Sequence, residues 1–372
     1  MRILVLILLP IGDTLFTTPA IHALRKRYPD ALITAFIYPT NAGILRSNPD
    51  IDELIFWPTR QSWPGFRRLF SLFWGVRKSH FDLAVEFCNY AGWVSVVAGI
   101  RRRVDMNLPH LWWIVPGAGR QWRRFHAVQH YFGPVLRLGI PIDDESLRIY
   151  PTSEEEARAQ DWLDKYRVAP DELIIGIHSG GEGLWGQKQW GPDRFAQVAS
   201  GLHDRLGGKV RILLMGGKDD APLASQIAAN THAYVINATG QTTLGETAAL
   251  ARKCALFIGN DSSPLHIAAA AGTRVVGIYG PTDPRSYRPW IPGGREGIDY
   301  AVVRSNLPCA CGFPLSGGIT VAEVFLCLMC PALKTITPKQ VLNACIKLLD
   351  NAHLLDKQPV TNEGALGARS RS

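Results

Sequence analysis

Residues 257–284 read Phe257-Ile-Gly-Asn-Asp-Ser-Ser-Pro-Leu-His-Ile-Ala-Ala-Ala-Ala-Gly-Thr-Arg-Val-Val-Gly-Ile-Tyr-Gly-Pro-Thr-Asp-Pro284, and no other segment is as informative. Ala255 to Ile258 predicts a strand, Pro264 to Ala271 a helix of small residues, and Val275 to Tyr279 a second strand. This order is typical of a parallel sheet, so the polar turn before the helix lies at a strand's carboxyl end. Ligands of open α/β sheets bind at that end, and a helix N-terminus suits a phosphate. The segment therefore predicts a site for a phosphorylated ligand.

The same alternation occurs twice along the chain and predicts an α/β fold of two domains with parallel sheets. In the first domain we expect strands at Ile3 to Leu9, Leu32 to Ile37, Glu53 to Phe56 and Leu83 to Phe87, and helices at Thr18 to Tyr28 and Phe66 to Ser79. In the second we expect strands at Leu173 to Ile177, Val210 to Met215, Tyr234 to Asn237, Ala255 to Ile258 and Val275 to Tyr279, and helices at Arg194 to Leu206, Pro222 to Ala229, Leu244 to Lys253 and Pro264 to Ala271. Two facing sheets leave a cleft, and ligands prefer such clefts.

The boundary between the domains is expected near residues 165 to 172, where Pro170 and Asp171 break the pattern. A helix from Thr152 to Lys165 precedes it, and a last helix from Pro338 to Leu349 ends the second domain. The domains are therefore 1–168 and 169–350, and the polar residues 356–372 are expected to form a disordered tail.

Composition indicates a globular protein, since the 372 residues are 47% hydrophobic and 19% charged. The net charge of +8 is uneven, because residues 1–150 contain 18 Lys or Arg against 11 Asp or Glu, and seven of the eleven tryptophans. A basic, Trp-rich half suggests an anionic partner or a membrane surface. A soluble domain with ordinary surface arginines fits the same counts, and both interpretations stay open. The apolar face of the helix from Phe66 to Ser79 fits an interfacial helix or, as we favour, packing on its own sheet.

The amino terminus resembles an export signal, because Arg2 precedes the apolar run Ile3 to Leu9. The run is short, no cleavage site follows, and a turn at Asp13 leads into a helix, so a first buried strand is the better interpretation. No later apolar run is long enough to span a bilayer. We expect a cytoplasmic protein.

The seven cysteines are an odd number in a large chain, which argues against a disulfide scaffold. Four of them cluster as Cys309-Ala-Cys311 and Cys327-Leu-Met-Cys330. Reduced structural thiols among core residues are favoured, a zinc site is the alternative, and redox pairing is a third possibility.

Asp13 is the candidate catalytic residue, because Pro10-Ile11-Gly12-Asp13-Thr14 places a carboxylate where the first strand meets the cleft. A carboxylate there can act as a general base on an acceptor hydroxyl. By position alone, a helix cap is the favoured interpretation of an Asp.

A glycine-rich loop from Gly176 to Lys188 predicts a second binding element, with Lys188 as a mobile cation for phosphate oxygens. The loop is not a Walker motif, since Gln189 follows the lysine, and no dinucleotide fingerprint opens either sheet. A glycine-rich turn without function is the alternative.

Several further residues are weaker candidates. Gly216 and Gly217 end a strand at the same sheet edge, where a nucleotide can lie, and Glu246 can accept ribose hydroxyls or simply favour a helix start. Asp50-Ile-Asp52 resembles a metal-binding pair, although an exposed turn is favoured there. His22, His178 and His266 are equally well explained as core residues.

Three motifs occur together in this chain: Gly12-Asp13-Thr14 with Thr18-Pro19-Ala20 and Leu24-Arg25, then Lys188-Gln-Trp190, and the run from Asn260-Asp-Ser-Ser-Pro-Leu-His266 to Gly280-Pro-Thr-Asp-Pro284. With them the chain resembles glycosyltransferase family 9, the lipopolysaccharide heptosyltransferases, over roughly residues 1 to 350. The family often has glycine where this chain has Ser263.

The resemblance implies a GT-B architecture, with two facing Rossmann-like domains that bind the acceptor and the nucleotide sugar. It implies inverting, metal-independent transfer of a heptose from ADP-heptose to the lipopolysaccharide inner core or a similar glycolipid, at the inner-membrane surface, without a cofactor or a nucleic-acid partner. The residues it assigns are Asp13 as the base, Gly12 and Thr14 on the acceptor side, and Lys188, Asp261, Ser262, Ser263, His266, Glu246, Ser179 and Gly180 for the donor, to which its position at a strand end adds Gly216.

Two other function classes are weighed against this one. A nicotinamide-dependent oxidoreductase also uses two α/β domains, but it needs the glycine fingerprint that this chain lacks. A catalytically silent binder of nucleotide sugars would keep Lys188 and Asp261 and could dispense with Asp13.

Overall fold

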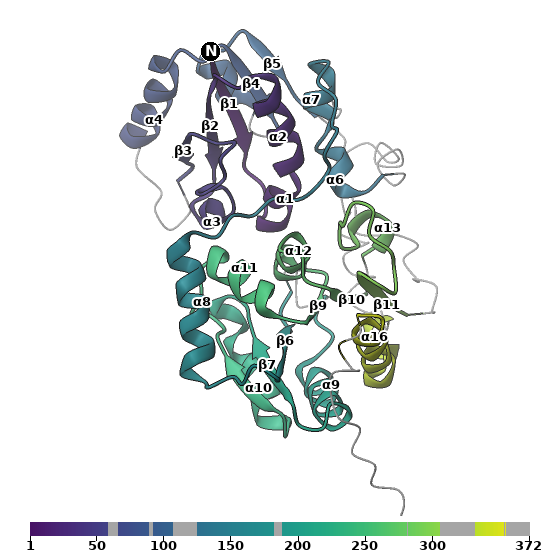
Figure 1. The fold of residues 1–372 in the computed structure, drawn as a ribbon. Coiled ribbons are helices and arrows are strands. Elements are labelled where there is room, and N and C mark those ends of the chain that lie inside the picture. The colour runs from purple at the N-terminus through teal and green to yellow at the C-terminus, as the bar shows by residue number, and fades with distance from the viewer. Residues whose placement is uncertain are drawn as a thin grey trace, which may run out of the picture.

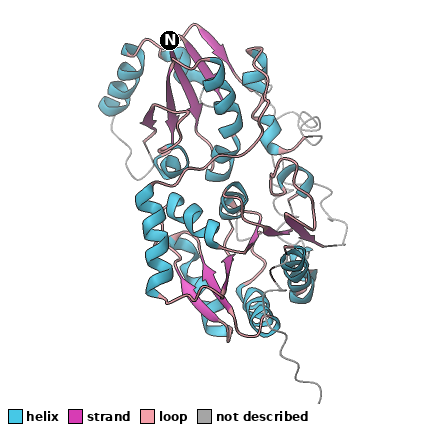
Figure 2. Cartoon of the chain, viewed as in Figure 1, coloured by secondary structure: helices cyan, strands magenta, loops and turns pink. Residues whose placement is uncertain are grey.

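The computed structural model describes residues 1–58, 66–88, 92–106, 125–181, 188–280, 282–305, 332–352 and 354, with the backbone alone at 66–71. Figure 1 shows two lobes, each built around one sheet, and Figure 2 shows the strands of each sheet among helices. The cysteine cluster at 309–330 and the predicted tail at 356–372 lie outside the described residues.

The amino-terminal lobe has a five-stranded parallel sheet in the order β3-β2-β1-β4-β5. Its strands are β1 (Arg2–Ile7), β2 (Leu32–Ile37), β3 (Glu53–Phe56), β4 (Leu83–Glu86) and β5 (Arg102–Val104). Its helices are α1 (Ile11–Phe16), α2 (Thr18–Arg27), η1 (Pro39–Asn41), α3 (Ala42–Leu45), α4 (Phe66–Lys78), α5 (Gly92–Val97), α6 (Ala127–His130) and α7 (Gly133–Arg137). The run Ile3 to Ile7 is fully buried at the centre of this sheet, as expected for a strand rather than a signal segment.

One correction concerns the segment after the first strand, which the sequence predicted to be a turn and which is the short helix α1. Pro10 stands at its N-cap with φ −57°, a value that the proline ring imposes. The Thr14 N–H then donates to the Pro10 carbonyl across 2.8 Å and closes the first turn. The helix carries Asp13 in this turn.

The carboxy-terminal lobe has a six-stranded parallel sheet in the order β11-β10-β9-β6-β7-β8. Its strands are β6 (Leu173–His178), β7 (Val210–Leu214), β8 (Tyr234–Asn237), β9 (Leu256–Asn260), β10 (Val275–Tyr279) and β11 (Tyr300–Arg304). Its helices are α9 (Pro192–Arg205), η7 (Lys218–Asp220), α10 (Ala221–Asn230), α11 (Leu244–Lys253), α12 (Ser263–Ala270), α13 (Pro284–Tyr287), α15 (Ala332–Thr335) and α16 (Pro338–Asn351). The edge strands β5 and β11 were not predicted, although Tyr300 to Val303 of β11 are apolar.

The connecting helix α8 (Ser153–Lys165) belongs in space to the carboxy-terminal lobe. Thr152 and Glu155 form a capping box at its start. Its buried residues Ala159 and Leu163 belong to the same core as residues of α11, and Figure 1 shows α8 beside α11. In space the second lobe therefore begins near Pro151, before the predicted boundary at 165 to 172.

The two lobes touch each other through hydrogen bonds between distant segments. The Gly12 N–H donates to the Ser263 hydroxyl across 3.1 Å, and the Trp290 indole N–H donates to the Glu145 carbonyl across 2.8 Å. Ile267 of α12 is fully buried in the core of the amino-terminal lobe. Among the described helices, none is long and apolar enough to cross a membrane.

Candidate active site

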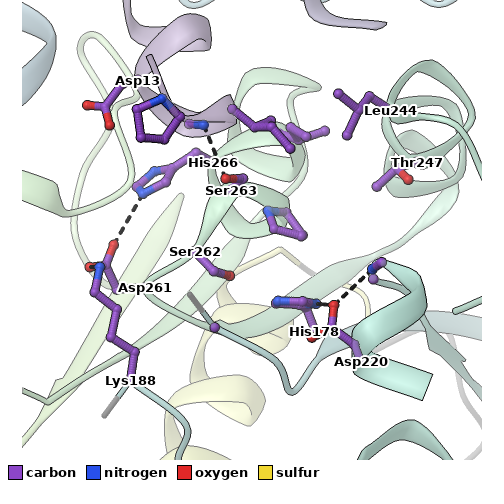
Figure 3. A pocket seen from close by; sticks show the side chains of 18 of the residues that line it. Asp13, His178, Lys188, Asp220, Leu244, Thr247, Asp261, Ser262, Ser263 and His266 are labelled. Carbon is purple, nitrogen blue, oxygen red and sulfur yellow. Dashed lines mark hydrogen bonds and ion pairs between the residues drawn. The ribbon is translucent and has the colours of Figure 1, made fainter. Parts of the chain in front are cut away.

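A cavity of about 660 Å³ lies between the lobes, at the carboxyl ends of the central strands of both sheets. The amino-terminal lobe lines it with Pro10, Ile11, Gly12, Asp13 and Phe16. The carboxy-terminal lobe lines it with His178, Gly181, Lys188, Gln189, Gly216, Gly217, Asp219, Asp220, Thr242, Leu244, Thr247, Asp261, Ser262, Ser263, Pro264, His266, Ile267 and Tyr287. Figure 3 shows Asp13 across the cavity from Lys188 and Asp261.

Asp13 does not cap a helix, which corrects the interpretation favoured from its position. The N-cap of α1 is Pro10, and no side chain caps the helix. One carboxylate oxygen of Asp13, Oδ1, instead accepts a 2.8 Å hydrogen bond from the Tyr131 hydroxyl. Burial raises the pKa of Asp13, while the Tyr131 hydrogen bond and the nearby His266 and Lys188 lower it in part. A carboxylate with a raised pKa is suited to accept a proton.

Lys188, Asp261 and His266 form an ionic cluster at the opposite wall. Lys188 Nζ lies 2.9 Å from Asp261 Oδ2, and His266 Nε2 lies 3.3 Å from Asp261 Oδ1. Burial alone would raise the pKa of Asp261, but Lys188 and His266 together hold it below its ordinary value. Asp261 is therefore an anion at neutral pH, and it fixes the position of the lysine ammonium.

The turn between β9 and α12 presents the helix N-terminus to the cavity. Ser262 is the N-cap residue, and its hydroxyl donates to the Asn260 carbonyl rather than capping the helix. Ser263 occupies the first turn and accepts the Gly12 hydrogen bond from the other lobe. The dipole of α12 thus adds positive potential beside Lys188. The helix N-terminus and the lysine together suit a diphosphate.

The wall formed by the ends of β6 and β7 requires glycine. A Cβ at Gly216 would lie 2.7 Å from Asp220 Oδ2 and 3.0 Å from His178 Nδ1. Asp220 accepts the Gly217 N–H across 2.8 Å, and His178 Nδ1 lies 3.0 Å from the Met215 carbonyl. Burial lowers the pKa of His178, although Asp220 offsets part of the effect, so this imidazole is neutral at pH 7.

Four residues assigned by resemblance do not line the cavity. The Thr14 hydroxyl is buried between the Pro10 carbonyl, to which it donates, and the Asn41 amide, from which it accepts. The carbonyls of Ser179 and Gly180 each accept a 2.8 Å hydrogen bond from the Asn260 amide, which fixes the end of β6. The fourth residue is Glu246.

Glu246 serves the start of α11. Its Oε2 accepts the Thr243 N–H across 2.9 Å in a capping box, and its Oε1 accepts a 2.9 Å hydrogen bond from Arg158 of α8. The side chain is 6% exposed. One oxygen is therefore engaged at the start of α11 itself, and the other joins α11 to α8.

Replacement of Glu246 with alanine is expected to lower the free energy of unfolding by about 1 to 2 kcal/mol, because α11 loses its cap. Arg158→Ala is the matched control. This variant removes the exposed partner of the Arg158–Glu246 ion pair and keeps the cap of α11. It is expected to lower the free energy of unfolding by less than about 0.5 kcal/mol. Urea denaturation checks both values. A large loss of ADP affinity in Glu246→Ala at unchanged stability would instead support the ribose-binding role.

The Asp50 and Asp52 pair is engaged in local structure. Asp50 is buried, not exposed as expected, and its carboxylate lies 3.0 Å from His22 Nδ1. Asp52 pairs with Arg25 and accepts the Ile33 N–H across 2.7 Å. Among the described residues, no group of three or more His, Cys, Asp or Glu side chains is placed to hold a metal ion.

Sequence reasoning missed several residues of the site. Tyr131 contacts Asp13 from 118 residues away, and no local pattern marks it. Tyr287 and Thr247 reach the cavity from α13 and α11. Asp220 had a signal that was not used, since it follows Gly216 and Gly217 at the same sheet edge.

Comparison with known proteins identifies the family. The sequence model of glycosyltransferase family 9 (heptosyltransferase) matches residues 99–296. Lipopolysaccharide heptosyltransferase 3 of Escherichia coli is 28% identical over 295 residues, which cover 75% of this chain and 83% of the relative. Lipopolysaccharide heptosyltransferase 2 of Escherichia coli strain K12 is 24% identical and covers 76% of this chain and 84% of the relative.

Solved structures show the same fold. The glycosyl transferase family 9 structure from Veillonella parvula DSM 2008 has a TM-score of 0.74 at 23% identity and covers 96% of this chain and 98% of its own. The E. coli ADP-heptose lps heptosyltransferase II has a TM-score of 0.70 at 22% identity, covering 95% and 100%. They confirm the predicted GT-B architecture of two facing parallel-sheet domains. The family match spans more than half of the sequence, and the chain therefore belongs to glycosyltransferase family 9 and is an enzyme that transfers a sugar from an activated donor.

Proposed function

We propose that this enzyme transfers a heptose from ADP-heptose to a hydroxyl of the lipopolysaccharide inner core, with inversion at the anomeric carbon and without a metal ion. The names of the curated relatives support the sugar and the acceptor. The observation that carries the mechanism is one cavity that brings Asp13 from the first lobe to Lys188 and Asp261 of the second.

The base of this reaction is Asp13. Its carboxylate takes the proton of the acceptor hydroxyl while that oxygen forms a bond to the anomeric carbon of the donor. Because Asp13 and Lys188 lie on opposite lobes, the acceptor can attack from the face opposite the departing diphosphate, and this attack inverts the configuration. The carboxylate replaces bulk water as the proton acceptor within the cleft.

The leaving group is stabilised by Lys188 and the N-terminus of α12. When the bond between the anomeric carbon and the phosphate oxygen breaks, the electron pair moves to the diphosphate of ADP. Lys188 is already held in place by Asp261, so its charge needs no reorganisation during the reaction. Ser262 and Ser263 bring backbone N–H groups to the same region. The wall of Gly216, Gly217 and His178 leaves room for the nucleoside.

The acceptor is expected to reach the cavity from a membrane. The basic amino-terminal lobe suits a phosphorylated glycolipid, and Trp74 of α4 and Trp93 of α5 are about half exposed on it. We place the enzyme at the cytoplasmic face of the inner membrane, which co-sedimentation with anionic vesicles would test.

The test of the proposed function is a panel of nucleotide sugars with truncated lipopolysaccharide acceptors in the presence of EDTA. ADP-heptose is expected to be consumed with release of ADP and a mass gain of the acceptor, at the same rate with or without the chelator. Transfer that stops in EDTA and returns with magnesium would contradict the metal-independent mechanism. A panel in which no donor is consumed would favour a silent binder of nucleotide sugars.

A further inference from the structure

The contact between Tyr131 and Asp13 extends the proposed site. Tyr131 stands at the C-cap of α6, far along the chain from α1, and its hydroxyl donates to Asp13 Oδ1 across 2.8 Å. A hydrogen bond to one oxygen fixes the rotation of the carboxylate and leaves Oδ2 for another partner.

We propose that Tyr131 is a positioning residue for the base. Its hydroxyl binds one carboxylate oxygen of Asp13 and so directs the other oxygen to the acceptor hydroxyl. This inference rests on the proposed function, since it assumes that Asp13 accepts the proton.

The chemistry of the tyrosine hydroxyl suits this role. Burial raises the pKa of Tyr131 well above its ordinary value, and the charge of Asp13 raises it further, so the hydroxyl keeps its proton throughout the working pH range. It is therefore a fixed donor to the carboxylate. A donor to the ionised form favours that form and keeps the buried carboxylate available as a base.

The helix that carries Tyr131 is anchored on the opposite lobe. His126 caps α6, since its Nδ1 accepts the Val128 N–H across 3.2 Å. Its Nε2 lies 2.8 Å from the Arg288 carbonyl of the carboxy-terminal lobe, and its ring packs at a tilt against Trp290, with centroids 4.5 Å apart. Figure 1 shows α6 beside α13 at the junction of the lobes.

This anchor has a defined protonation state. Burial lowers the pKa of His126 to about 3, so the ring is neutral. Because Nδ1 accepts a hydrogen bond, Nε2 carries the proton and donates to Arg288. The position of Tyr131, and through it of Asp13, thus depends on the contact between the lobes that encloses the substrate.

The charges around Asp13 set the sign of the expected pH effect. Tyr131 and Tyr287 face it as neutral hydroxyls, His266 and Lys188 lower its pKa, and Asp261 raises it. Burial raises the pKa of Asp13, and the Tyr131 hydrogen bond lowers it. Without the Tyr131 hydroxyl the pKa of Asp13 therefore rises further. Because the base must be ionised, the acid limb of activity then moves to higher pH.

The test is Tyr131→Phe. The expected result is a loss of about 10- to 100-fold in kcat, the scale of one hydrogen bond to a charged group, with the acid limb of kcat/KM about one pH unit higher. The KM for the donor and the Kd for ADP are expected to stay within about twofold, because the ring does not touch the nucleotide wall.

Two further variants make the result specific. Thr273→Val removes a different buried hydroxyl, which donates to the Ala251 carbonyl across 2.6 Å outside the cavity lining, and is expected to keep the wild-type pH profile. Replacement of Tyr131 with 3-fluorotyrosine keeps the ring and makes the hydroxyl a stronger hydrogen-bond donor. The ionised form of Asp13 is then favoured, so its pKa falls and the acid limb moves to lower pH. This second variant decides the question if the phenylalanine variant fails to bind ADP.

An acid limb that stays in place in both Tyr131 variants, with kcat within twofold of the wild type, would overturn the inference. Asp13→Asn separates this failure from a failure of the proposed function. If Asp13→Asn is inactive while Tyr131→Phe is normal, the positioning role is wrong. If Asp13→Asn retains turnover, the base is wrong.

Discussion

Asp13→Asn is expected to lower kcat by about 10³-fold while ADP binds with an unchanged Kd. Asparagine has nearly the same shape and can still accept the Tyr131 hydrogen bond, but it cannot take the proton of the acceptor hydroxyl, and a positioned general base contributes about 10²- to 10⁴-fold. In the proposed site the nucleotide is held on the other lobe, so we expect its binding not to depend on this carboxylate. Release of ADP under saturating substrates measures kcat, and calorimetry measures the Kd.

The matched control is Asp143→Asn. Asp143 lies on the same lobe and is paired with Lys26 at the exposed surface, outside the cavity lining. We expect it to leave kcat within twofold of the wild type. Turnover above a tenth of the wild-type rate in Asp13→Asn would exclude Asp13 as the base.

Lys188→Met is expected to lower kcat/KM by about 10²- to 10³-fold and to weaken ADP binding as well. The substitution removes the cation that we propose faces the diphosphate, and one such group contributes about this much to the stabilisation of developing charge. It also leaves Asp261, whose side chain is 4% exposed, without its 2.9 Å partner and close to an incoming anion. The lost cation and the unpaired carboxylate both disfavour a diphosphate in the cavity, so we expect weaker ADP binding and slower turnover.

Lys209→Met provides the comparison for this variant. Lys209 also pairs with an aspartate, Asp171, across 2.8 Å, but both side chains are exposed and remote from the cavity. Its loss is expected to change neither kcat nor the Kd for ADP. If Lys188→Met binds ADP as tightly as the wild type, the assignment of Lys188 to the diphosphate would fail.

The predicted strands agree with the structure where apolar residues form a continuous run. Ile3 to Ile7 of β1 and all of β9 are buried, and these strands needed no long-range information to be recognised. Parallel strands carry ligand-binding turns at their carboxyl ends, and this rule alone predicts Asp13 and Asp261 at the cleft. Helix α1 was missed because six residues are too few to show a helical period, and the edge strands β5 and β11 were missed as well.

Packing decides which polar atoms of a motif are already engaged within the protein. Thr14 and Glu246 sit in motifs that resemble those of the family, yet the structure engages their oxygens within the protein. Helix α8 precedes the predicted boundary and still packs on the second lobe, because its apolar residues fit α11. A sequence shows which residues are apolar, but not which surface will bury them.

The sequence by itself determined the two parallel sheets and the polar turn before α12, because short-range periodicity and β-α-β order define them. It also placed Asp13 and Lys188 in segments that follow strands, while their proposed roles came from the resemblance to the family. Only the tertiary structure decided that Tyr131 holds Asp13, that Asp261 holds Lys188 and that α6 joins the lobes. These contacts connect residues 73 to 162 positions apart, and such distances leave no trace in local sequence patterns.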